Sequence, residues 1–406
     1  MIRGKENKPH IGIYGRINVG KSSLINKLIN QEISIISEIK GTTTDPVKRS
    51  FEILGFGPVI FIDTAGIDDS GELGSLRTGK TYATLDKIDL AIIVISDNNF
   101  GEYEEDLINQ LNKFNTPFFI IHNKSDIVAI TPELLNKLTN KYHVPVLDFS
   151  SRSGIQNEFV FTTIKKLIPE SSWIFNSMLG GIIEKGDIVL LITPIDSEAP
   201  EGRLILPQVQ TIRDILDNNC IAIVLKETEL EGFLKNNSVK PKLAITDSQV
   251  FAEVYALIPE EIPLTGFSVL MAKHKGDFEN YLKGTPKISQ LKDNDKVLIL
   301  ESCSHHVSCD DIGRVKIPAL LKKFTGKQLD FVVVAGLDNI PGKITDYALI
   351  VQCGGCVLTK KQIINRIKPA VEADIPITNY GMLIAYVNGI FDKAVKPFLD
   401  IKKTDL

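Results

Sequence analysis

One short segment near the N-terminus limits the choice of fold more than any other part of the sequence. Gly15 to Ser22 reads G-x-x-x-x-G-K-S and lies between the apolar run His10 to Tyr14 and a helical pattern. In such a strand, loop and helix, the backbone amides turn inward on phosphate groups, and the helix N-terminus favours their negative charge. We expect the Lys21 ammonium to reach the β- and γ-phosphates and the Ser22 hydroxyl to bind Mg²⁺. The nucleotide-binding residues predicted here are Gly15, Asn18, Val19, Gly20, Lys21, Ser22 and Ser23.

A second motif begins at the last residue of the apolar run Val59 to Asp63 and is expected to lie near the γ-phosphate. It reads Asp63-Thr64-Ala65-Gly66. Its position predicts that the Asp63 carboxylate lies near the Mg²⁺ and the Gly66 amide near the γ-phosphate. Ile67 follows, where Ras-like enzymes carry a glutamine that orients water. Because isoleucine offers no hydrogen bond, intrinsic hydrolysis should be slow and depend on another group.

Two further motifs indicate which base the nucleotide carries. Asn123-Lys124-Ser125-Asp126 follows the apolar run Pro117 to His122. The Asp126 carboxylate can accept the N1 and N2 protons of guanine, which adenine does not offer. Ser150 and Ser151 follow another apolar run and can present a backbone amide to guanine O6. The sequence therefore predicts a GTP site.

The rest of the chain continues to alternate apolar runs with helical patterns, which predicts an α/β fold with largely parallel sheets. We expect three domains, over residues 1–172, 173–261 and 262–406. The acidic run Glu102 to Asp106 is interpreted as a solvated helix start whose carboxylates favour the helix dipole. The middle segment has no recognisable catalytic cluster, which favours a structural or subunit-contact role.

Four of the five cysteines lie between Cys303 and Cys356. Cys303 follows the apolar run Lys296 to Glu301, and Cys353 and Cys356 follow the run Ala348 to Gln352, so all three lie at the carboxyl ends of predicted strands. Cys-x-x-Cys binds one metal through both thiolates, and Cys303 with His305 would complete a site of three or four ligands. Spacing alone leaves Zn²⁺ and an iron-sulfur cluster both open.

The nucleotide motifs together resemble those of translation-factor-related GTPases, in the branch that contains Era and the tRNA-modification GTPase TrmE. In that branch a threonine-rich first switch supplies a Mg²⁺ ligand. Gly41-Thr42-Thr43-Thr44-Asp45 is similar to that switch, with Thr43 the best aligned residue. Asn18 matches the asparagine that helps TrmE-like members to bind an activating K⁺. The resemblance thus implies Mg²⁺ at Ser22 and Thr43, and K⁺ at Asn18.

Across essentially its whole length, the chain resembles the FeFe-hydrogenase maturation GTPases, the HydF family. The resemblance rests on two segments. They are Cys303-Ser304-His305 and, after a spacer of 46 residues, Gln352-Cys353-Gly354-Gly355-Cys356. The family signature is Cys-x-His followed by His-Cys-x-x-Cys, so Gln352 departs from it. The resemblance implies a P-loop GTPase domain, a small α/β dimerisation domain and a parallel-sheet α/β domain that binds a cluster.

The resemblance also implies the chemistry of the third domain. Cys303, Cys353 and Cys356 would be the thiolate ligands of a 4Fe-4S cluster, with His305 the first candidate and Glu301 the second for the fourth ligand. The implied function is a GTP-hydrolysing scaffold that receives a diiron precursor and delivers it to the apo-hydrogenase. The partners implied are a second copy of the chain, the apo FeFe-hydrogenase and the radical-SAM maturases.

Composition and charge limit the possible partners and locations of the protein. A net charge of -4 and the lack of a basic, aromatic-bearing stripe argue against nucleic acid as the main partner. Apolar runs fall far short of the roughly 20 residues of a membrane span, and no signal-peptide pattern is recognised, so we expect a cytoplasmic protein.

Two other functions are compatible with the motifs. One alternative is a TrmE- or Era-like GTPase serving RNA, with a zinc-stabilised C-terminal domain. Another is a redox module that uses Cys353 and Cys356 as a dithiol.

Overall fold

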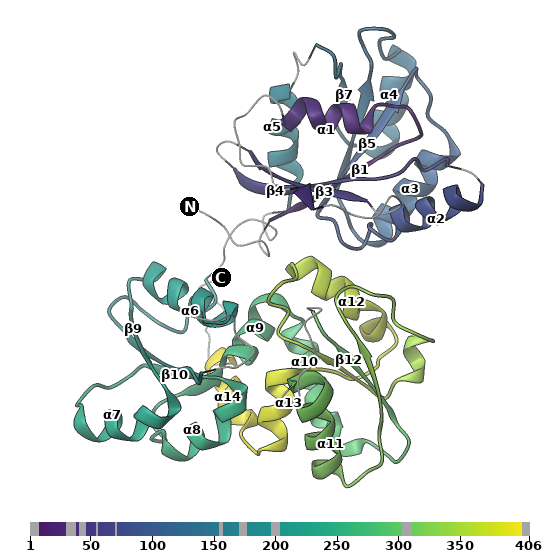
Figure 1. Ribbon diagram of the computed structural model, residues 1–406. Coiled ribbons are helices and arrows are strands. Elements are labelled where there is room, and N and C mark those ends of the chain that lie inside the picture. Colours follow the sequence, from purple (N-terminus) through teal and green to yellow (C-terminus); the bar gives the residue numbers. More distant parts are fainter. Residues whose placement is uncertain are drawn as a thin grey trace. The chain divides into compact units, whose positions relative to one another are not determined.

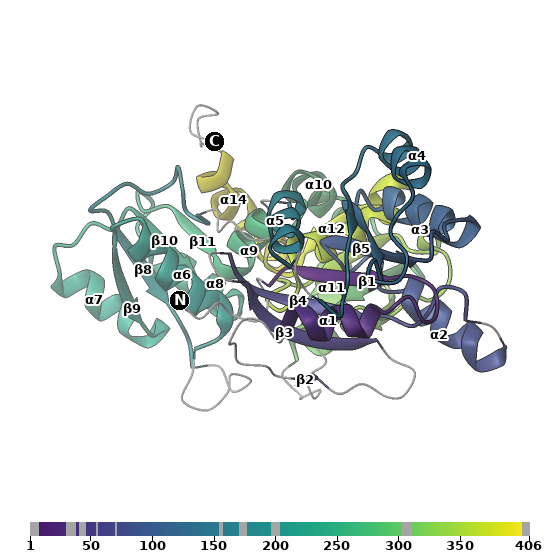
Figure 2. The same cartoon turned by 90° about the horizontal axis from the view of Figure 1, so that it is seen from above.

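The computed structural model describes residues 8–29, 38–39, 46–53, 56–69, 71–153, 157–169, 177–195, 204–302 and 311–399. The chain divides into two compact units, Met1–Ile174 and Phe175–Leu406, and each is described by itself (Figures 1 and 2). Both units consist of helices packed on sheets that are wholly or largely parallel, which confirms the predicted α/β class.

A seven-stranded sheet forms the centre of the N-terminal unit, in the order β2-β3-β4-β1-β5-β6-β7. The five strands from β4 to β7 in this order are parallel, whereas β3 is antiparallel to both β4 and β2. The strands are β1 (His10–Tyr14), β2 (Glu38–Ile39), β3 (Val47–Ile53), β4 (Gly57–Asp63), β5 (Leu90–Ser96), β6 (Phe118–Asn123) and β7 (Val146–Asp148).

Helices cover both faces of this sheet. α1 (Lys21–Ile29) and α5 (Asn157–Leu167) pack in one buried cluster, and α3 (Glu102–Lys113) and α4 (Pro132–Tyr142) pack in the other, which Tyr82 of α2 (Glu72–Tyr82) also contacts. Residues 90–95 of the interior strand β5 enter the two clusters in alternation, and all seven residues of the strand are buried. Burial on both faces is what the unbroken apolar run Leu90 to Ile95 predicts.

The C-terminal unit contains two sheets of four parallel strands each, in the orders β11-β10-β8-β9 and β13-β12-β14-β15. The first sheet consists of β8 (Ile188–Ile192), β9 (Ile221–Leu225), β10 (Leu243–Thr246) and β11 (Leu264–Gly266). The second consists of β12 (Lys296–Leu300), β13 (Asp330–Val334), β14 (Leu349–Gln352) and β15 (Ile377–Asn379).

Nine α-helices surround these two sheets in the part of the unit that the structure describes. They are α6 (Leu206–Asp217), α7 (Leu230–Asn236), α8 (Phe251–Leu257), α9 (Phe267–Lys275), α10 (Phe278–Gly284), α11 (Ile317–Thr325), α12 (Lys360–Glu372), α13 (Tyr380–Val387) and α14 (Phe391–Leu399). α9, α13 and α14 contact one another and lie between the two sheets (Figure 1).

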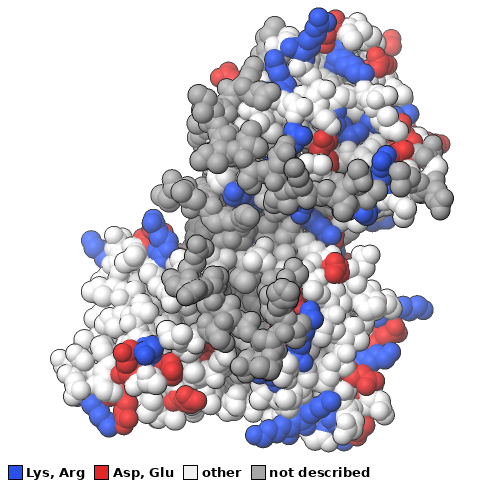
Figure 3. Space-filling view, in the orientation of Figure 1, with Lys and Arg blue, Asp and Glu red and all other residues white. Residues whose placement is uncertain are grey.

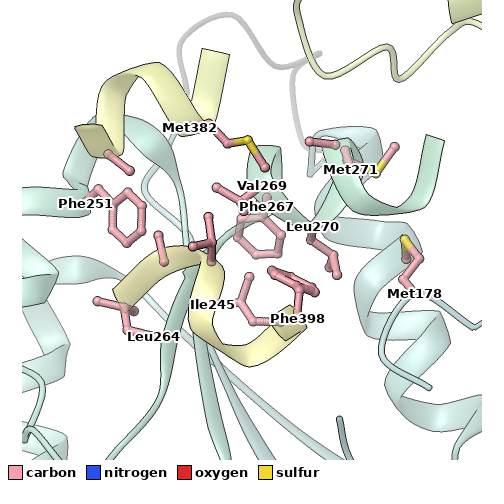
Figure 4. Packing of buried hydrophobic residues seen from close by; sticks show 14 of the residues in the cluster. Met178, Ile245, Phe251, Leu264, Phe267, Val269, Leu270, Met271, Met382 and Phe398 are labelled. Carbon is pink, nitrogen blue, oxygen red and sulfur yellow. The ribbon is translucent and has the colours of Figure 1, made fainter. Parts of the chain in front are cut away.

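One buried cluster extends from the first sheet to the second. It includes Ile192 and Ile245 of the first sheet, Phe267 of α9, and Leu298 and Ile350 of the second sheet. Figure 4 shows how Phe267, Val269 and Leu270 of α9 pack among side chains from the strands and from α13 and α14. Because the two sheets share this core, the C-terminal unit is compact as a whole.

The expected division between residues 261 and 262 does not follow this architecture. β11 lies beyond that point, yet it pairs with β10 and completes the first sheet. The helix α14, from the end of the chain, also packs on β11, and Thr265 Oγ1 donates to the carbonyl oxygen of Ala394 at 2.8 Å. A division at 261–262 would therefore separate β11 from the sheet that holds it.

Candidate functional sites

The loop between β1 and α1 is fixed by two close approaches. A Cβ on Gly15 would lie 2.2 Å from the carbonyl oxygen of Val94, and a Cβ on Gly20 would lie 2.4 Å from Nδ2 of Asn123. Gly20 and Asn18 have φ angles of 91° and 64°, in the left-handed region. Such turns direct successive N–H groups to one side, and the N-terminus of α1 adds its partial positive charge. The loop is a suitable site for an anion.

Lys21 begins α1 and folds back over this loop. Its Nζ donates to the carbonyl oxygens of Gly15 at 2.9 Å and Arg16 at 2.8 Å. Burial lowers the pKa of Lys21, whereas the nearby Asp63 and Asp68 carboxylates oppose that shift. The backbone thus holds the ammonium beside the concave loop, where it can neutralise phosphate charge.

Asp63 ends β4 and lies beside the first turn of α1. Its carboxylate accepts a hydrogen bond from Ser22, while its Oδ1 is buried without a hydrogen-bond partner among the described residues. Burial raises the pKa of Asp63, and Ser22, Lys21 and Arg49 oppose the rise. A buried carboxylate oxygen that lacks a partner is costly, and a magnesium ion would satisfy it. Ser22 and Asp63 therefore have the chemistry of a magnesium site.

The residues after Asp63 line an opening of about 420 Å³, together with Ser22 and Arg77. Ile67 is only 2% exposed and belongs to a buried cluster of the sheet, so its side chain points into the core. The Oδ1 of Asp68 accepts a hydrogen bond from the Ile17 amide at 2.7 Å. The residue that follows Gly66 is therefore unable to orient a water molecule. Thr43, the expected Mg²⁺ ligand, lies outside the described residues.

Asn123 joins the phosphate-binding loop to the two loops that the sequence predicts to read the base. Its Nδ2 donates to the carbonyl oxygen of Val19 at 2.9 Å, and its Oδ1 accepts from the amide and the hydroxyl of Ser151 at 3.1 and 2.9 Å. Ser150 Oγ donates to Asp126 Oδ1 at 2.7 Å, which orients that carboxylate. These bonds join three predicted motifs, which lie at the carboxyl ends of β1, β6 and β7.

Three further predicted residues border the same site. Asn18 and Ser23 are exposed, the first on the loop and the second in the first turn of α1. Lys124 is half-buried and has a φ angle of 63°. The K⁺ expected at Asn18 stays a prediction.

The acidic run at the start of α3 is not simply solvated, and this corrects the sequence-based interpretation. Glu104 is fully buried, and its two carboxylate oxygens accept from Nε and Nη2 of Arg16, each at 2.8 Å. One of them also accepts from the Gly101 amide at 2.8 Å. The Arg16 guanidinium lies 5.1 Å from the ring centroid of Tyr103. The second residue of the phosphate-binding loop is thus attached to α3.

A second candidate site lies in the C-terminal unit, where the loops after β12 and β14 meet. Cys353 and Cys356 follow β14, and Ser302 comes two residues after the end of β12. The Ser302 hydroxyl lies 2.7 Å from Cys353 Sγ, and the Gly355 amide donates to the same sulfur at 3.5 Å. Cys303 is the next residue in the chain and, like His305, lies outside the described residues.

The thiols of Cys353 and Cys356 are half-buried, and each lies near a cation. Burial raises the pKa of Cys353, and hydrogen bonds to the sulfur and the Arg366 guanidinium oppose the rise. Burial also raises the pKa of Cys356; Cys353 adds to that rise and Lys275 opposes it. Each cysteine therefore has a basic side chain near enough to favour its thiolate.

Two other residues expected near the cluster have defined partners. The Glu301 carboxylate is 4% exposed and pairs with Arg314, whose Nη2 donates at 2.8 Å and whose Nε is 3.1 Å from both oxygens. Glu301 could bind iron only if this pair opened. Gln352 Nε2 donates to Ser302 Oγ at 3.4 Å and to the carbonyl oxygen of Cys353 at 3.3 Å. Gln352 thus acts as a hydrogen-bond donor beside the thiols.

The donor atoms of this loop suit a soft metal or an iron-sulfur cluster. Two half-buried thiols occupy one short loop, and one of them accepts a hydrogen bond at sulfur, an arrangement that such clusters use. Among the described residues, no group of three or more His, Cys, Asp or Glu side chains could hold a metal ion. A third thiol would have to come from Cys303.

We predict that Glu104→Ala destabilises the N-terminal unit by about 2 kcal/mol, because it leaves the Arg16 guanidinium without its buried partner. This value is below the usual 3–5 kcal/mol for broken buried pairs, since Arg16 is 20% exposed. It should also weaken GDP binding, because Arg16 belongs to the phosphate-binding loop. Denaturant unfolding and a GDP titration provide the measurements.

The matched control is Glu105→Ala, in the next position of α3. Glu105 pairs with Lys141 at 2.8 Å, but both side chains are exposed. Exposed pairs contribute little to stability, so this variant should unfold and bind GDP like the wild type. Equal behaviour of the two variants would contradict the structural role of the Arg16–Glu104 pair.

Three family models match the chain. The hydrogen maturase F tetramerization domain matches residues 279–397, the hydrogen maturase F dimerization domain matches 178–276, and the 50S ribosome-binding GTPase matches 10–124. A GTPase Der from Wolinella succinogenes is 34% identical over 153 residues, 36% of this chain and 32% of the relative. A tRNA modification GTPase MnmE from Nitrosomonas europaea is 38% identical over 123 residues, 30% of this chain and 27% of the relative.

The chain thus spans about a third or less of these two curated relatives. A solved structure of Aquifex aeolicus Era is 21% identical, with a TM-score of 0.35, and the match covers 53% of this chain and 92% of Era. The two hydrogen maturase F models together match more than half of the 406 residues. With its N-terminal GTPase domain, the chain therefore belongs to the hydrogen maturase F family.

Proposed function

We propose that this protein is a GTP-hydrolysing scaffold for assembling the active site of FeFe-hydrogenase. It holds a 4Fe-4S cluster, receives a diiron precursor from radical-SAM maturases and delivers it to the apo-hydrogenase in the cytoplasm. The observation that carries the proposal is the loop from Cys353 to Cys356. It lies within the segment matched by a hydrogen maturase F model, in a chain that also carries a GTPase domain.

In the proposed nucleotide site, the loop amides and Lys21 bind the phosphates of GTP. Asp126 reads guanine, and Asn123 fixes the loops around it. Ser22, Thr43 and Asp63 would hold Mg²⁺, which would neutralise charge on the phosphates during the hydrolysis of GTP to GDP. The Gly66 amide meets the γ-phosphate. These roles match the closeness of Lys21, Ser22 and Asp63.

The buried Ile67 supports slow hydrolysis that depends on an added group, such as K⁺ at Asn18. A slow GTPase acts as a timer, so we infer that the nucleotide state changes contacts with the maturation partners. If the GTP and GDP forms bound every partner equally, this part of the proposal would be wrong.

In the proposed cluster site, Cys303, Cys353 and Cys356 supply three thiolates and leave one iron with an exchangeable ligand. His305 or Glu301 could supply that ligand. Glu301 would first have to leave Arg314. An iron with an exchangeable ligand could hold the diiron cargo through a bridging group.

The geometry of the first sheet of the C-terminal unit supports a homodimer. β9 is one of its two edge strands (Figure 1). The apolar side chains of Ile221 and Val224 on β9 are exposed, as are those of Val209 and Leu216 on α6. An exposed strand edge with apolar side chains is a template for pairing with another chain. We propose that a second copy covers this edge.

Charge gives no support to a nucleic-acid partner. On the face in Figure 3, the described Lys and Arg side chains are interspersed with Asp and Glu and form no continuous stripe. Among the described residues, no helix combines the length and the apolarity that crossing a bilayer requires.

The test of the cluster site is the iron and sulfide content of anaerobically purified protein. We expect about four irons and four sulfides per chain. Serine at Cys303, Cys353 or Cys356 should abolish or strongly reduce this content, because each removes a thiolate, and serine at Cys220 is the control. One zinc per chain without sulfide, also after anaerobic reconstitution, would contradict the proposal and favour the RNA-associated alternative.

The test of the dimer is sedimentation velocity of the Val224→Lys variant. A buried charge at the proposed interface should shift the protein to a species of half the mass. Leu257→Lys places the same charge at a position of similar exposure on α8 and should leave the assembly unchanged. An unaltered sedimentation coefficient for Val224→Lys would exclude this edge as the interface.

A further inference from the structure

Two buried cations contact the elements that carry the candidate cluster site, and they come from different parts of the chain. Lys275 ends α9 and is 3% exposed. Its Nζ donates to the carbonyl oxygens of Gly355 at 3.4 Å, Cys356 at 3.3 Å and Leu358 at 3.1 Å. The ammonium therefore lies directly against the loop of the two cysteines.

Arg366 lies on α12 and is 9% exposed. Its Nη1 donates to the carbonyl oxygen of Glu301 at 2.6 Å and its Nη2 to that of Val334 at 2.9 Å, so it joins the ends of β12 and β13. Its Nε has no hydrogen-bond partner among the described residues. A guanidinium keeps its charge when buried, so this side chain brings a fixed positive charge to the end of the sheet.

Burying a cation is costly unless an anion or strong acceptors compensate for the lost water. Both cations lie within electrostatic reach of a thiol, Arg366 of Cys353 and Lys275 of Cys356. A 4Fe-4S cluster on three thiolates carries one net negative charge when oxidised and two when reduced. The site thus contains positive charge where such a cluster would carry negative charge.

We propose that Lys275 and Arg366 are the counter-charges of an anionic iron-sulfur cluster at the Cys353–Cys356 loop and raise its reduction potential. The proposal rests on the proposed cluster function. It adds that a residue of the segment matched by the dimerization model, Lys275, controls a property of a cluster held by the segment matched by the tetramerization model.

Electrostatics determines the direction in which these charges shift the reduction potential. When the oxidised cluster takes one electron from a reductant, its net negative charge increases by one. Nearby positive charges in a medium of low dielectric constant stabilise the reduced form more than the oxidised form. Removing one of these charges should therefore lower the reduction potential, while a substitution that keeps the charge should preserve it.

The experiment is a potentiometric titration of the full-length, anaerobically reconstituted protein with dithionite, followed by electron paramagnetic resonance. Lys275→Gln removes the charge but keeps an N–H donor, and Lys275→Arg keeps both. We expect Lys275→Gln to shift the equilibrium between reduced and oxidised cluster at least tenfold toward the oxidised form, which is about 59 mV for one electron. Lys275→Arg should stay near the wild-type potential.

Two further comparisons separate a charge effect from a structural one. Lys273 lies on the same helix but is exposed, so Lys273→Gln should leave the potential unchanged. Arg366→Gln should lower the potential and Arg366→Lys should restore it, which keeps the test open if Lys275→Gln fails to fold. Circular dichroism and GDP binding report the fold of each variant.

The possible results distinguish a failure of the proposed charge role from a failure of the proposed cluster function. An intact cluster whose potential is the same in the wild type, Lys275→Gln and Arg366→Gln would overturn the charge role and leave the proposed function standing. A wild-type protein that assembles no iron-sulfur cluster would overturn both. A lower potential in both glutamine variants, with wild-type values for Lys275→Arg and Lys273→Gln, is the result that the structure predicts.

Discussion

Parallel strands that are buried on both faces leave only their ends for polar chemistry, and this constraint organises both units. In the N-terminal unit, the phosphate-binding loop, Asp63, Asn123 and Ser150 lie at or just after the carboxyl ends of β1, β4, β6 and β7. In the C-terminal unit, Glu301 and Cys353 follow β12 and β14 in the same way. Because neighbouring parallel strands end at one edge, residues far apart in sequence meet there.

Each of the two candidate sites also contains a buried lysine that is held by backbone carbonyl oxygens. Lys21 donates to carbonyl oxygens of the loop between β1 and α1, and Lys275 donates to carbonyl oxygens of the loop after β14. In each case the backbone holds a buried ammonium beside a loop that is suited to an anionic group. Both loops are thereby arranged before their ligand arrives, which reduces the free-energy cost of ordering them on binding.

Much of the fold and the nucleotide site could be predicted because fixed spacings and unbroken apolar runs encode them. β1 has the bounds that its apolar run indicates, and β5 extends beyond its run by one residue, Ser96. Strand β3 could not be predicted in this way. It contains Lys48, Arg49 and Glu52, and only Phe51 and Ile53 are buried, so its alternation is weak.

Contacts between residues that are far apart in the chain could not be predicted from the sequence, for a different reason. Glu104 lies in a run of acidic residues, and nothing in that run distinguishes it from Glu105; only the pairing with Arg16, 88 positions away, buries it. Lys275 is likewise one of several basic residues at the end of a helix, and its contact with Cys356 spans 81 positions. The strand β11 has only three residues, and its pairing with β10, which places it in the first sheet, is not evident from the sequence.

The central claim is that the chain carries an iron-bearing precursor on its cysteine loop and passes it to a hydrogenase. The most direct measurement is hydrogen evolution by purified apo-hydrogenase after incubation with the protein that the maturases have loaded. We expect activation by the wild type and its loss in Cys353→Ser, whose GTP hydrolysis should be intact. Equal activation by that variant, or no activation by a wild type with a full cluster content, would contradict the account.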